Sequence, residues 1–345
     1  MAARAHSPLG GADRGRRCDR TCAVRPVAPA RPHVRQRPSA EEVKDALVVW
    51  RLLDGKPGHE KQSLGLLQGL AAMAPVAAYE LDMRSKSMFW SEILRHIRGQ
   101  AMLPPPHLIV GVGHATHLPM LAARAACGGR TVVLMKPSLP LSLFDLIFVP
   151  RHDHYPNKGN VVGTWGVICP TTDEGKVPDE GLVLIGGPNR TYDWQPDAVA
   201  EAVSAIADAS PEIRWTACDS RRTPTGLAER VAPRENLVWQ SWRRAPEDFL
   251  QDALARASYV WVTADSVSML YEALSARAQV GIIAMPTRRP HAASKYARGI
   301  EALRERRHVL ASEDGYRIQD SRLSDFRPEN RRCAEIVLER LVVPR

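Results

Sequence analysis

Short apolar runs alternate with longer amphipathic stretches along most of this chain. The first run, residues 46–53 (ALVVWRLL), has the length of a strand. Residues 62–73 follow, with leucines at positions 64, 67 and 70, the spacing of one helix face. Because strands that alternate with helices form parallel βαβ units, the pattern predicts an α/β protein with doubly wound sheets. The next predicted strands are 76–81, 107–111, 131–135, 146–149 and 161–163.

The pattern starts again after a polar segment at 170–181, whose sequence PTTDEGKVPDEG is typical of a linker. Beyond it we predict strands at 182–185, 213–217, 237–239, 260–263 and 280–284, and helices at 196–209, 249–257 and 266–276. The chain then has four parts: a disordered basic tail (1–44), an N-terminal Rossmann-like domain (45–169), the linker, and a C-terminal Rossmann-like domain (182–345). Open α/β sheets bind ligands at the carboxyl ends of their strands, so we expect the two domains to face each other across a cleft.

The positive charge of the chain is concentrated in its first 40 residues. The net charge is +9, and this segment, with nine Arg and two Asp, carries +7 of it. A nearly neutral body is not typical of a nucleic-acid-binding fold, so we expect no nucleic-acid partner. With five Pro and no periodic apolar pattern, the segment is predicted to be disordered. It lacks the apolar stretch of a secretory signal and is Arg-rich as a transit peptide is, but a start codon assigned too far upstream is the interpretation we favour.

The cysteines indicate a reducing compartment. All six are scattered through the sequence, as free thiols are in a cytoplasmic protein. Cys18 and Cys22 form a C-x3-C pair without a second pair to complete a zinc site, so we expect neither a metal nor a bound cofactor. No run of about 18 apolar residues occurs, so we expect no membrane span. Nothing in the sequence predicts an oligomeric state.

The first predicted strand ends in a turn at residues 54–59 (DGKPGH) that could bind a substrate. Its two glycines would let the backbone approach a ligand closely, and its lysine adds a positive charge. His59 could act as a general base on a hydroxyl. The alternative is a plain turn with a surface histidine. We assign His59 as the catalytic residue and Asp54, Gly55, Lys56 and Gly58 as substrate-binding residues.

A second glycine turn follows the strand at 107–111. It starts like the dinucleotide motif G-x-G-x-x-G, but Thr116 replaces the third glycine and no acidic residue ends a strand about 20 positions later. A nicotinamide-dinucleotide site is therefore not favoured. We expect the turn to face the substrate together with Lys136, which ends the next predicted strand. The residues assigned here are Gly111, Gly113, His114 and Lys136.

The strand at 260–263 runs into a helix through a polar junction. Thr263, Asp265 and Ser266 can each cap that helix. Its free N–H groups and its dipole would favour an anion such as a diphosphate, and Glu272 could accept hydrogen bonds from a ribose. The alternative is an ordinary capped helix with a solvated glutamate. The nucleotide-binding residues predicted here are Thr263, Asp265, Ser266, Val267, Ser268 and Glu272.

Two further turns end the first two strands of the second half. One reads Gly-Gly-Pro-Asn at 186–189 and the other Ser-Arg-Arg-Thr at 220–223. Arg221 or Arg222 could bind a phosphate through two parallel hydrogen bonds. Each turn taken alone is expected to have a structural role. Because both turns lie at the carboxyl ends of strands, a role in binding is favoured. We assign Gly186, Gly187, Asn189, Ser220 and Arg221 to the nucleotide site.

The stretch 84–98 is both amphipathic and basic. Trp90, Ile93, Leu94 and Ile97 are predicted to share one helix face. A basic amphipathic helix can lie on an anionic membrane surface, whereas packing against the core with a solvated basic side is the commoner explanation. The flanking basic residues are Arg84, Lys86, Arg95 and Arg98.

Four of these motifs occur together in one known family: 54–62 (DGKPGHEKQ), 111–117 (GVGHATH), 186–188 (GGP) and 263–273 (TADSVSMLYEA). On them the chain, from about residue 46 to its end, resembles the mitochondrial-fission "elongated mitochondria" family. These plant and bacterial proteins are related to GT-B glycosyltransferases, and the plant members are known for a role in organelle division. The resemblance implies a GT-B-like fold.

A more distant similarity links the chain to the glycosyltransferase that forms lipid II. Gly58-His59 is similar to the end of that enzyme's glycine-rich loop, although Pro57 stands where the loop has its middle glycine. The similarity implies that His59 lies in the base region for the acceptor, that Ser266 to Ser268 hold the diphosphate, and that Glu272 holds the ribose.

These observations favour a metal-independent glycosyltransferase with a nucleotide-sugar co-substrate and a cell-envelope or lipid-linked acceptor. The alternative is a non-catalytic GT-B-fold adaptor in membrane or organelle division or envelope assembly, which predicts no nucleotide binding. A dinucleotide-dependent epimerase is not favoured, because neither Tyr271 nor Tyr296 has a lysine four residues later. We expect a cytoplasmic protein, peripheral on the inner face of the cytoplasmic membrane.

Overall fold

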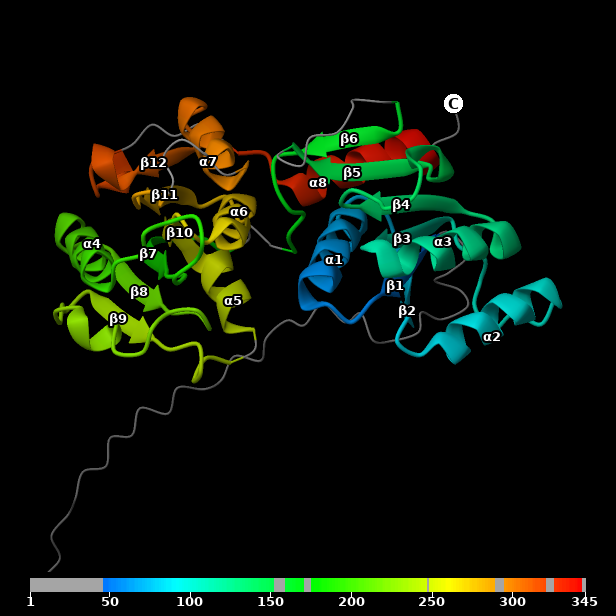
Figure 1. Cartoon of the computed structure of the whole chain (residues 1–345), viewed down its shortest axis with the longest axis horizontal. Helices are drawn as coiled ribbons and strands as arrows, with labels where there is room; N and C mark the ends of the chain where they lie inside the picture. The colour runs from blue at the N-terminus through cyan, green and yellow to red at the C-terminus, as the bar shows by residue number, and fades with distance from the viewer. Residues whose placement is uncertain are drawn as a thin grey trace, which may run out of the picture. The chain divides into compact units, whose positions relative to one another are not determined.

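The computed structural model describes residues 46–151, 159–170, 175–246, 248–288, 295–320 and 326–342. The predicted tail, with Cys18 and Cys22, lies outside them. Within the described residues there are two parallel sheets of six strands each, and helices connect the strands (Figure 1). The predicted α/β class with two Rossmann-like sheets is confirmed.

The first sheet has the strand order β2-β1-β3-β4-β5-β6. Apart from the edge strand β2, its strands are largely buried on both faces, as in other parallel sheets covered by helices. Trp50, Ile109, Val133 and Ile147 are completely inaccessible. The strands are β1 (Leu47–Leu53), β2 (Val76–Asp82), β3 (Leu108–Val112), β4 (Arg130–Leu134), β5 (Leu146–Pro150) and β6 (Val161–Thr164). The helices are α1 (Pro57–Ala71), α2 (Lys86–Ile97) and α3 (His114–Cys127), and a 3-10 turn spans Leu141–Leu143.

The second sheet has the order β12-β11-β10-β7-β8-β9. Its strands are β7 (Val177–Leu184), β8 (Arg214–Cys218), β9 (Leu237–Gln240), β10 (Ala257–Thr263), β11 (Gln279–Ile283) and β12 (Val309–Ala311). The helices are α4 (Pro196–Ala209), α5 (Phe249–Arg256), α6 (Val267–Ser275), α7 (Lys295–Glu305) and α8 (Glu329–Val337), and the chain continues as a π-helix at Leu338–Val342. Short 3-10 turns lie at Ala228–Arg230, Ser312–Asp314 and Ile318–Asp320.

The last helix packs on the first. The carbonyl of Asn330 in α8 lies so close to Gly69 of α1 that a side chain at position 69 would overlap with it. Gly65 of α1 likewise lies against the backbone of Cys169, where an added Cβ would be 2.7 Å from the carbonyl carbon. Two glycines one helical turn apart therefore allow α1 to approach its neighbours at backbone distance.

The strand order reverses at one point in each sheet, and these points position the candidate sites. In the first sheet the chain moves from β1 outward to β2 and then back to β3, so the loops after β1 and β3 flank the crevice. In the second sheet the same reversal lies between β7 and β10. The three glycine turns at 54–59, 111–117 and 186–189 and the polar junction at 263–266 each begin at one of these four strand ends.

Candidate functional sites

The turn after β1 holds an imidazole against a buried carboxylate. Nδ1 of His59 lies 2.8 Å from Oδ2 of Asp54, whose side chain is only 2% exposed. The second carboxylate oxygen, Oδ1, accepts a hydrogen bond from the Lys56 N–H at 3.1 Å, which closes the turn. Because an ionised carboxylate only accepts hydrogen bonds, the pairing places the imidazole proton on Nδ1 and leaves Nε2 able to accept one.

Gly113, at the end of β3, completes this pair. It has a φ of +83°, and a Cβ added there would lie 2.6 Å from Cε1 of His59 and 3.3 Å from Oδ2 of Asp54. The histidine ring therefore occupies the space that a side chain at position 113 would fill. Two of the predicted glycine turns thus meet at the switch point of the first sheet, around His59.

The other first-half residues lie at the same sheet edge with less specific surroundings. Gly55 adopts a φ of +81° against the side chain of Arg84, and Gly58 has open space around it. Gly111 is buried below α3, where its missing side chain makes room for Met120 and Thr116. His114 and Lys56 are exposed, and so is Lys136, which follows β4.

His117, one turn after His114, is buried and has a different environment. Its Nδ1 lies 3.2 Å from the Ser138 hydroxyl, and its Nε2 is buried without a partner. Burial, and then the nearby His114, lower the pKa of His117, which therefore favours its neutral form. Among the described residues, no group of three or more His, Cys, Asp or Glu side chains could hold a metal ion.

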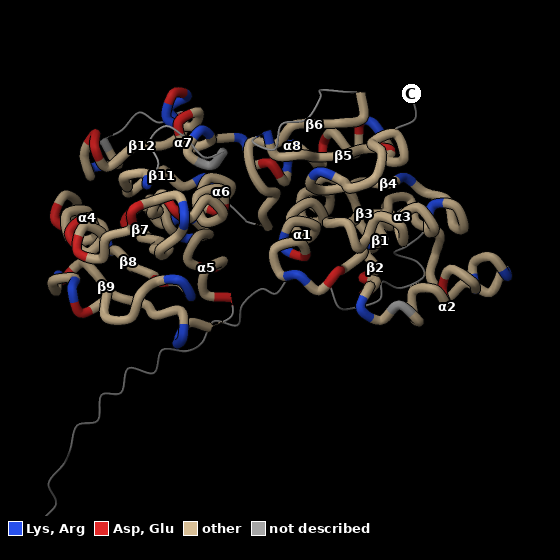
Figure 2. Tube along the Cα trace, viewed as in Figure 1, with Lys and Arg blue, Asp and Glu red and all other residues tan. Residues whose placement is uncertain are grey.

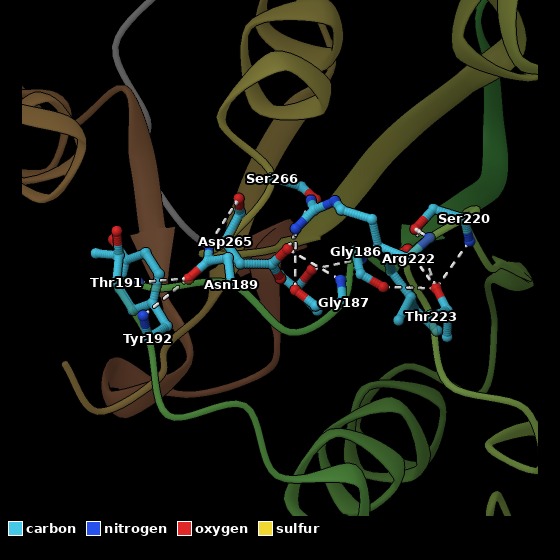
Figure 3. A network of polar contacts seen from close by, with 12 residues as sticks. Gly186, Gly187, Asn189, Thr191, Tyr192, Ser220, Arg222, Thr223, Asp265 and Ser266 are labelled. Atoms are coloured by element: carbon cyan, nitrogen blue, oxygen red, sulfur yellow. Dashed lines mark hydrogen bonds and ion pairs between the residues drawn. The ribbon is translucent and has the colours of Figure 1, made fainter. Parts of the chain in front are cut away.

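The second-half site is built around the buried carboxylate of Asp265 (Figure 3). Its Oδ2 accepts hydrogen bonds from the Gly187 N–H at 3.0 Å and from the Ser266 hydroxyl at 3.2 Å. The guanidinium of Arg222 pairs with the same oxygen at 2.8 Å and also donates to the Ser266 hydroxyl and the Gly187 carbonyl, both at 3.0 Å. Arg222 therefore balances a carboxylate whose side chain is completely buried.

Backbone contacts join the loops after β7 and β10 at the switch point. The Gly186 N–H donates to the Thr263 hydroxyl at 2.8 Å, and a side chain at Gly186 would overlap with those of Asp265 and Ser266. The side-chain oxygen of Asn189 accepts hydrogen bonds from the N–H groups of Thr191 and Tyr192. Together these bonds fix the first loop against the start of α6.

A cavity of about 480 Å³ opens at the N-terminus of α6. The first backbone hydrogen bond of the helix runs from the Leu270 N–H to the Ser266 carbonyl, so the N–H groups of the three preceding residues are outside the helical ladder. Oδ1 of Asp265 is buried without a partner. The site thus offers a guanidinium, free helix N–H groups and one unpaired acceptor. The lining residues are Asn189, Thr191, Tyr192, Arg222, Asp265, Ser266, Val267, Ser268 and Met269.

Three residues predicted to bind the nucleotide make other contacts in the structure. Arg222, and not Arg221, enters the site, since Arg221 lies over the ring of Trp242. Ser220 bonds within its own turn, where its N–H donates to the Thr223 hydroxyl. Glu272 does not line the cavity, because it is one and a half turns into α6 and its Oε1 pairs with the Lys61 ammonium at 2.7 Å.

One aromatic and one aliphatic residue of the cavity wall are not indicated by any sequence pattern. Met269 and Tyr192 line it, and the Tyr192 side chain is buried. Burial, together with the negative charge of Asp265, raises the pKa of Tyr192, so its phenol stays protonated and can donate a hydrogen bond. Tyr192 follows the predicted Gly-Gly-Pro-Asn turn by only three residues, which is the one signal that could have indicated it.

The cysteines in the described residues are free. They are Cys127, Cys169, Cys218 and Cys333, as predicted. Burial raises the pKa of the Cys127 thiol to about 11 and of the Cys218 thiol to about 12, so neither forms a thiolate near neutral pH.

The motifs that meet at the switch point of each sheet agree with one family, whose model matches residues 57–341. The chain belongs to the mitochondrial fission ELM1 family. The matched residues include all four motifs, apart from residues 54–56 of the first motif. No curated protein matches this ELM1-family chain.

Solved structures similar to this ELM1-family chain share its GT-B fold. A candidate UDP-N-acetylglucosamine 2-epimerase from Listeria monocytogenes has a TM-score of 0.52 at 12% identity, covering 85% of this chain and 95% of its own. The UGT2 of Phytolacca americana, complexed with UDP-2-fluoroglucose and pterostilbene, has a TM-score of 0.45 at 10% identity, covering 86% and 90%. At these identities the similarity shows the fold alone.

Proposed function

We propose that this chain is a glycosyltransferase that uses a nucleotide-sugar donor without a metal ion. The observation that carries the proposal is the cavity at the N-terminus of α6, where Arg222 and three N–H groups outside the helical ladder surround the same space. Both features bind anions, and a diphosphate needs more than one such donor. The GT-B fold of the ELM1 family supports the proposal as an analogy.

In this mechanism the donor diphosphate binds Arg222 from the cavity while the guanidinium stays paired with Asp265. The Arg222 side chain is 45% exposed and pairs with the carboxylate through one of its several donors, so other donors can bind a ligand. The N–H groups of Val267 and Ser268 and the helix dipole add to the positive potential. They act as fixed donors for the charge that develops on the leaving diphosphate, in place of a metal ion.

His59 is the general base of the proposed reaction. Its Nε2 accepts the proton of an acceptor hydroxyl while that oxygen forms a bond to the anomeric carbon of the donor sugar. The bond from this carbon to the diphosphate oxygen breaks, and its electron pair leaves on the nucleoside diphosphate. Asp54 holds the imidazole in the tautomer that this step needs and stabilises the imidazolium that forms.

The acceptor that we propose is a sugar of the cell envelope or one linked to a lipid. The His59 side chain is 20% exposed, and the exposed Lys136 and His114 lie at the same sheet edge. Cationic and polar groups around a base suit an acceptor that carries phosphate or sugar hydroxyls.

A non-catalytic adaptor is the second candidate, and the family description as a mitochondrial fission protein favours it. An adaptor would use the same fold as a scaffold. It predicts that no nucleotide binds at α6 and that His59 can be replaced without loss of function.

A thermal-shift screen with UDP-, GDP-, CMP- and dTDP-sugars, followed by assay of nucleoside diphosphate release, tests the proposal. We expect one donor class to raise the melting temperature, and His59→Gln to abolish release while the shift remains. His59→Gln is suitable because the amide can still bond to Asp54 but cannot accept a proton. No shift with any donor, together with full function of His59→Gln, would favour the adaptor.

A further inference from the structure

Helix α2 exposes an apolar face that the described chain leaves uncovered. Trp90 is 47% exposed, Leu94 43% and Ile97 64%. These three residues recur every three or four positions and therefore lie along one side of the helix. The core contacts of α2 are made instead by Phe89 and Ile93, which are 2% and 5% exposed. Ile93, which the sequence places on the same side as Trp90 and Ile97, lies at the buried edge of this face.

The chain after α2 is bound to the buried side of the helix. Oε1 of Glu92 accepts hydrogen bonds from the N–H groups of Met102 and Leu103, both at 2.9 Å. Glu92 itself is 5% exposed, so its carboxylate fixes the loop to the helix from inside. Leu103 turns inward against the core, whereas Met102 stays 60% exposed. The loop therefore presents one more large apolar side chain to solvent in a defined position.

Basic residues outnumber acidic ones around the face. Residues 84–98 contain four basic residues and one carboxylate, Glu92. Hydrogen bonds from Leu103, Met102 and Arg95 more than offset the effect of burial and lower the pKa of Glu92, which stays ionised and pairs with Arg95. Arg84 pairs with Asp82, while Arg98 is exposed at the end of the helix. Figure 2 marks basic positions before and at the end of α2.

We infer that this face, formed by Trp90, Leu94 and Ile97, docks on an anionic lipid surface. A bilayer interface takes up large apolar side chains and a Trp ring at the headgroup level, while arginines bind lipid phosphates. The apolar residues of α2 suit insertion into the interface, and its basic flanks suit the lipid phosphates. A neutral protein partner would use only the apolar residues. No helix in the described residues is long and apolar enough to cross a membrane, so the contact is peripheral.

Flotation of the full chain with lipid vesicles tests this inference, which does not rest on the glycosyltransferase proposal. The probes are phosphatidylcholine vesicles and vesicles with about one third phosphatidylglycerol. We expect the chain to float with the anionic vesicles and much less with the neutral ones, and to be released by salt. Ile97→Asp should reduce the bound fraction about tenfold or more, because it places a charge where an apolar side chain inserts.

Val238→Asp is the matched control. Val238 is 63% exposed on β9. The substitution therefore adds the same negative charge at nearly the same exposure in the other sheet. We expect this variant to float as the unchanged chain does, and Arg98→Gln to weaken binding to anionic vesicles only. Circular dichroism of each variant establishes that it is folded. Equal flotation of the Ile97 and Val238 variants, or equal binding to neutral and anionic vesicles, would overturn the inference. So would an Ile97→Asp variant that still floats but changes the oligomeric state.

Discussion

Both sheets place a buried aspartate at their switch point, yet the two aspartates pair with residues of different chemistry. In the first sheet Asp54 pairs with His59, a group that can gain and lose a proton. In the second, Asp265 pairs with Arg222, a group that stays charged, and both lie at the free end of a helix. In the proposed reaction, the same topology would serve proton transfer in one half and anion binding in the other.

In the proposed reaction, the sites in the two sheets have different roles. Around Asp54 the glycines keep space open for an imidazole ring, since Gly113 has no side chain to displace it. Around Asp265 the Gly187 N–H donates to the carboxylate, and the Gly186 N–H donates to the Thr263 hydroxyl. The residue that each aspartate orients, and not the aspartate, determines what each half can do.

Gly187→Ala should have the largest effect on the second site. An alanine Cβ would overlap with the backbone carbonyl of Arg222, which cannot move without shifting the loop after β8. We expect a loss of about 1–3 kcal/mol in the free energy of unfolding, measured in urea, and a loss of nucleotide binding. Gly159→Ala, where the added Cβ meets nothing within 4 Å, is the control and should stay near zero. Similar losses for both variants would mean that the loops are not packed as described.

Asp54→Asn tests the first site. An amide oxygen can replace one acceptor, but the amide can also donate to Nδ1, so the imidazole loses its fixed tautomer. We expect kcat to fall about tenfold or more, less than for loss of the base itself, with the donor Kd unchanged. A change confined to the donor Kd would contradict the division between the two sites.

Gly113→Ala and Gly128→Ala form a matched pair for the packing on His59. Both glycines have backbone angles that other residues rarely adopt, with φ of +83° and ψ of 158° for Gly113, and φ of +77° and ψ of −159° for Gly128. Only Gly113 lies against another residue's side chain. Each variant should lose about 1–3 kcal/mol of stability from strain alone, measured by urea unfolding. Activity should fall further only for Gly113→Ala, because only its Cβ displaces His59.

The smallest effect concerns the pH dependence of the second site. Burial and Asp265 raise the pKa of Tyr192 above its ordinary value of 10.0, so the folded state binds this proton more tightly than the unfolded state. The resulting stability is complete below pH 10 and is lost as the pH rises above it. Tyr192→Phe should therefore make the free energy of unfolding fall less steeply above pH 10. An unchanged slope would place Tyr192 away from Asp265.

Much of the fold was predictable, because strands of a parallel sheet are buried on both faces and appear as apolar runs. Eleven of the twelve strands were expected. The exception, β12 (Val309–Ala311), is too short to form a recognisable run. The start of α1 was placed too late, since Pro57 and Gly58 suggest a turn, although Pro is well tolerated in the first turn of a helix. The strand β7 begins at Val177, within the segment predicted as a linker.

The sequence predicts which loops form the sites, but not which side chains of those loops enter them. Switch-point topology brings the four motifs to strand ends, and this follows from the alternating pattern. The choice between Arg221 and Arg222 depends on which way each side chain leaves its turn, which residue type does not encode. The Asp54–His59 pair likewise depends on α1 beginning at Pro57, which turns His59 back toward the strand end.

Calorimetric titration with nucleoside diphosphates tests most directly whether the cavity at α6 binds a diphosphate. Arg222→Ala removes the guanidinium at the cavity, and Arg221→Ala removes the neighbouring one that lies over Trp242. We predict that at least one nucleoside diphosphate binds the unchanged chain, that Arg222→Ala weakens binding about tenfold or more, and that Arg221→Ala binds as the unchanged chain does. Absence of binding by every nucleoside diphosphate, or equal affinity in the chain and in Arg222→Ala, would contradict the account.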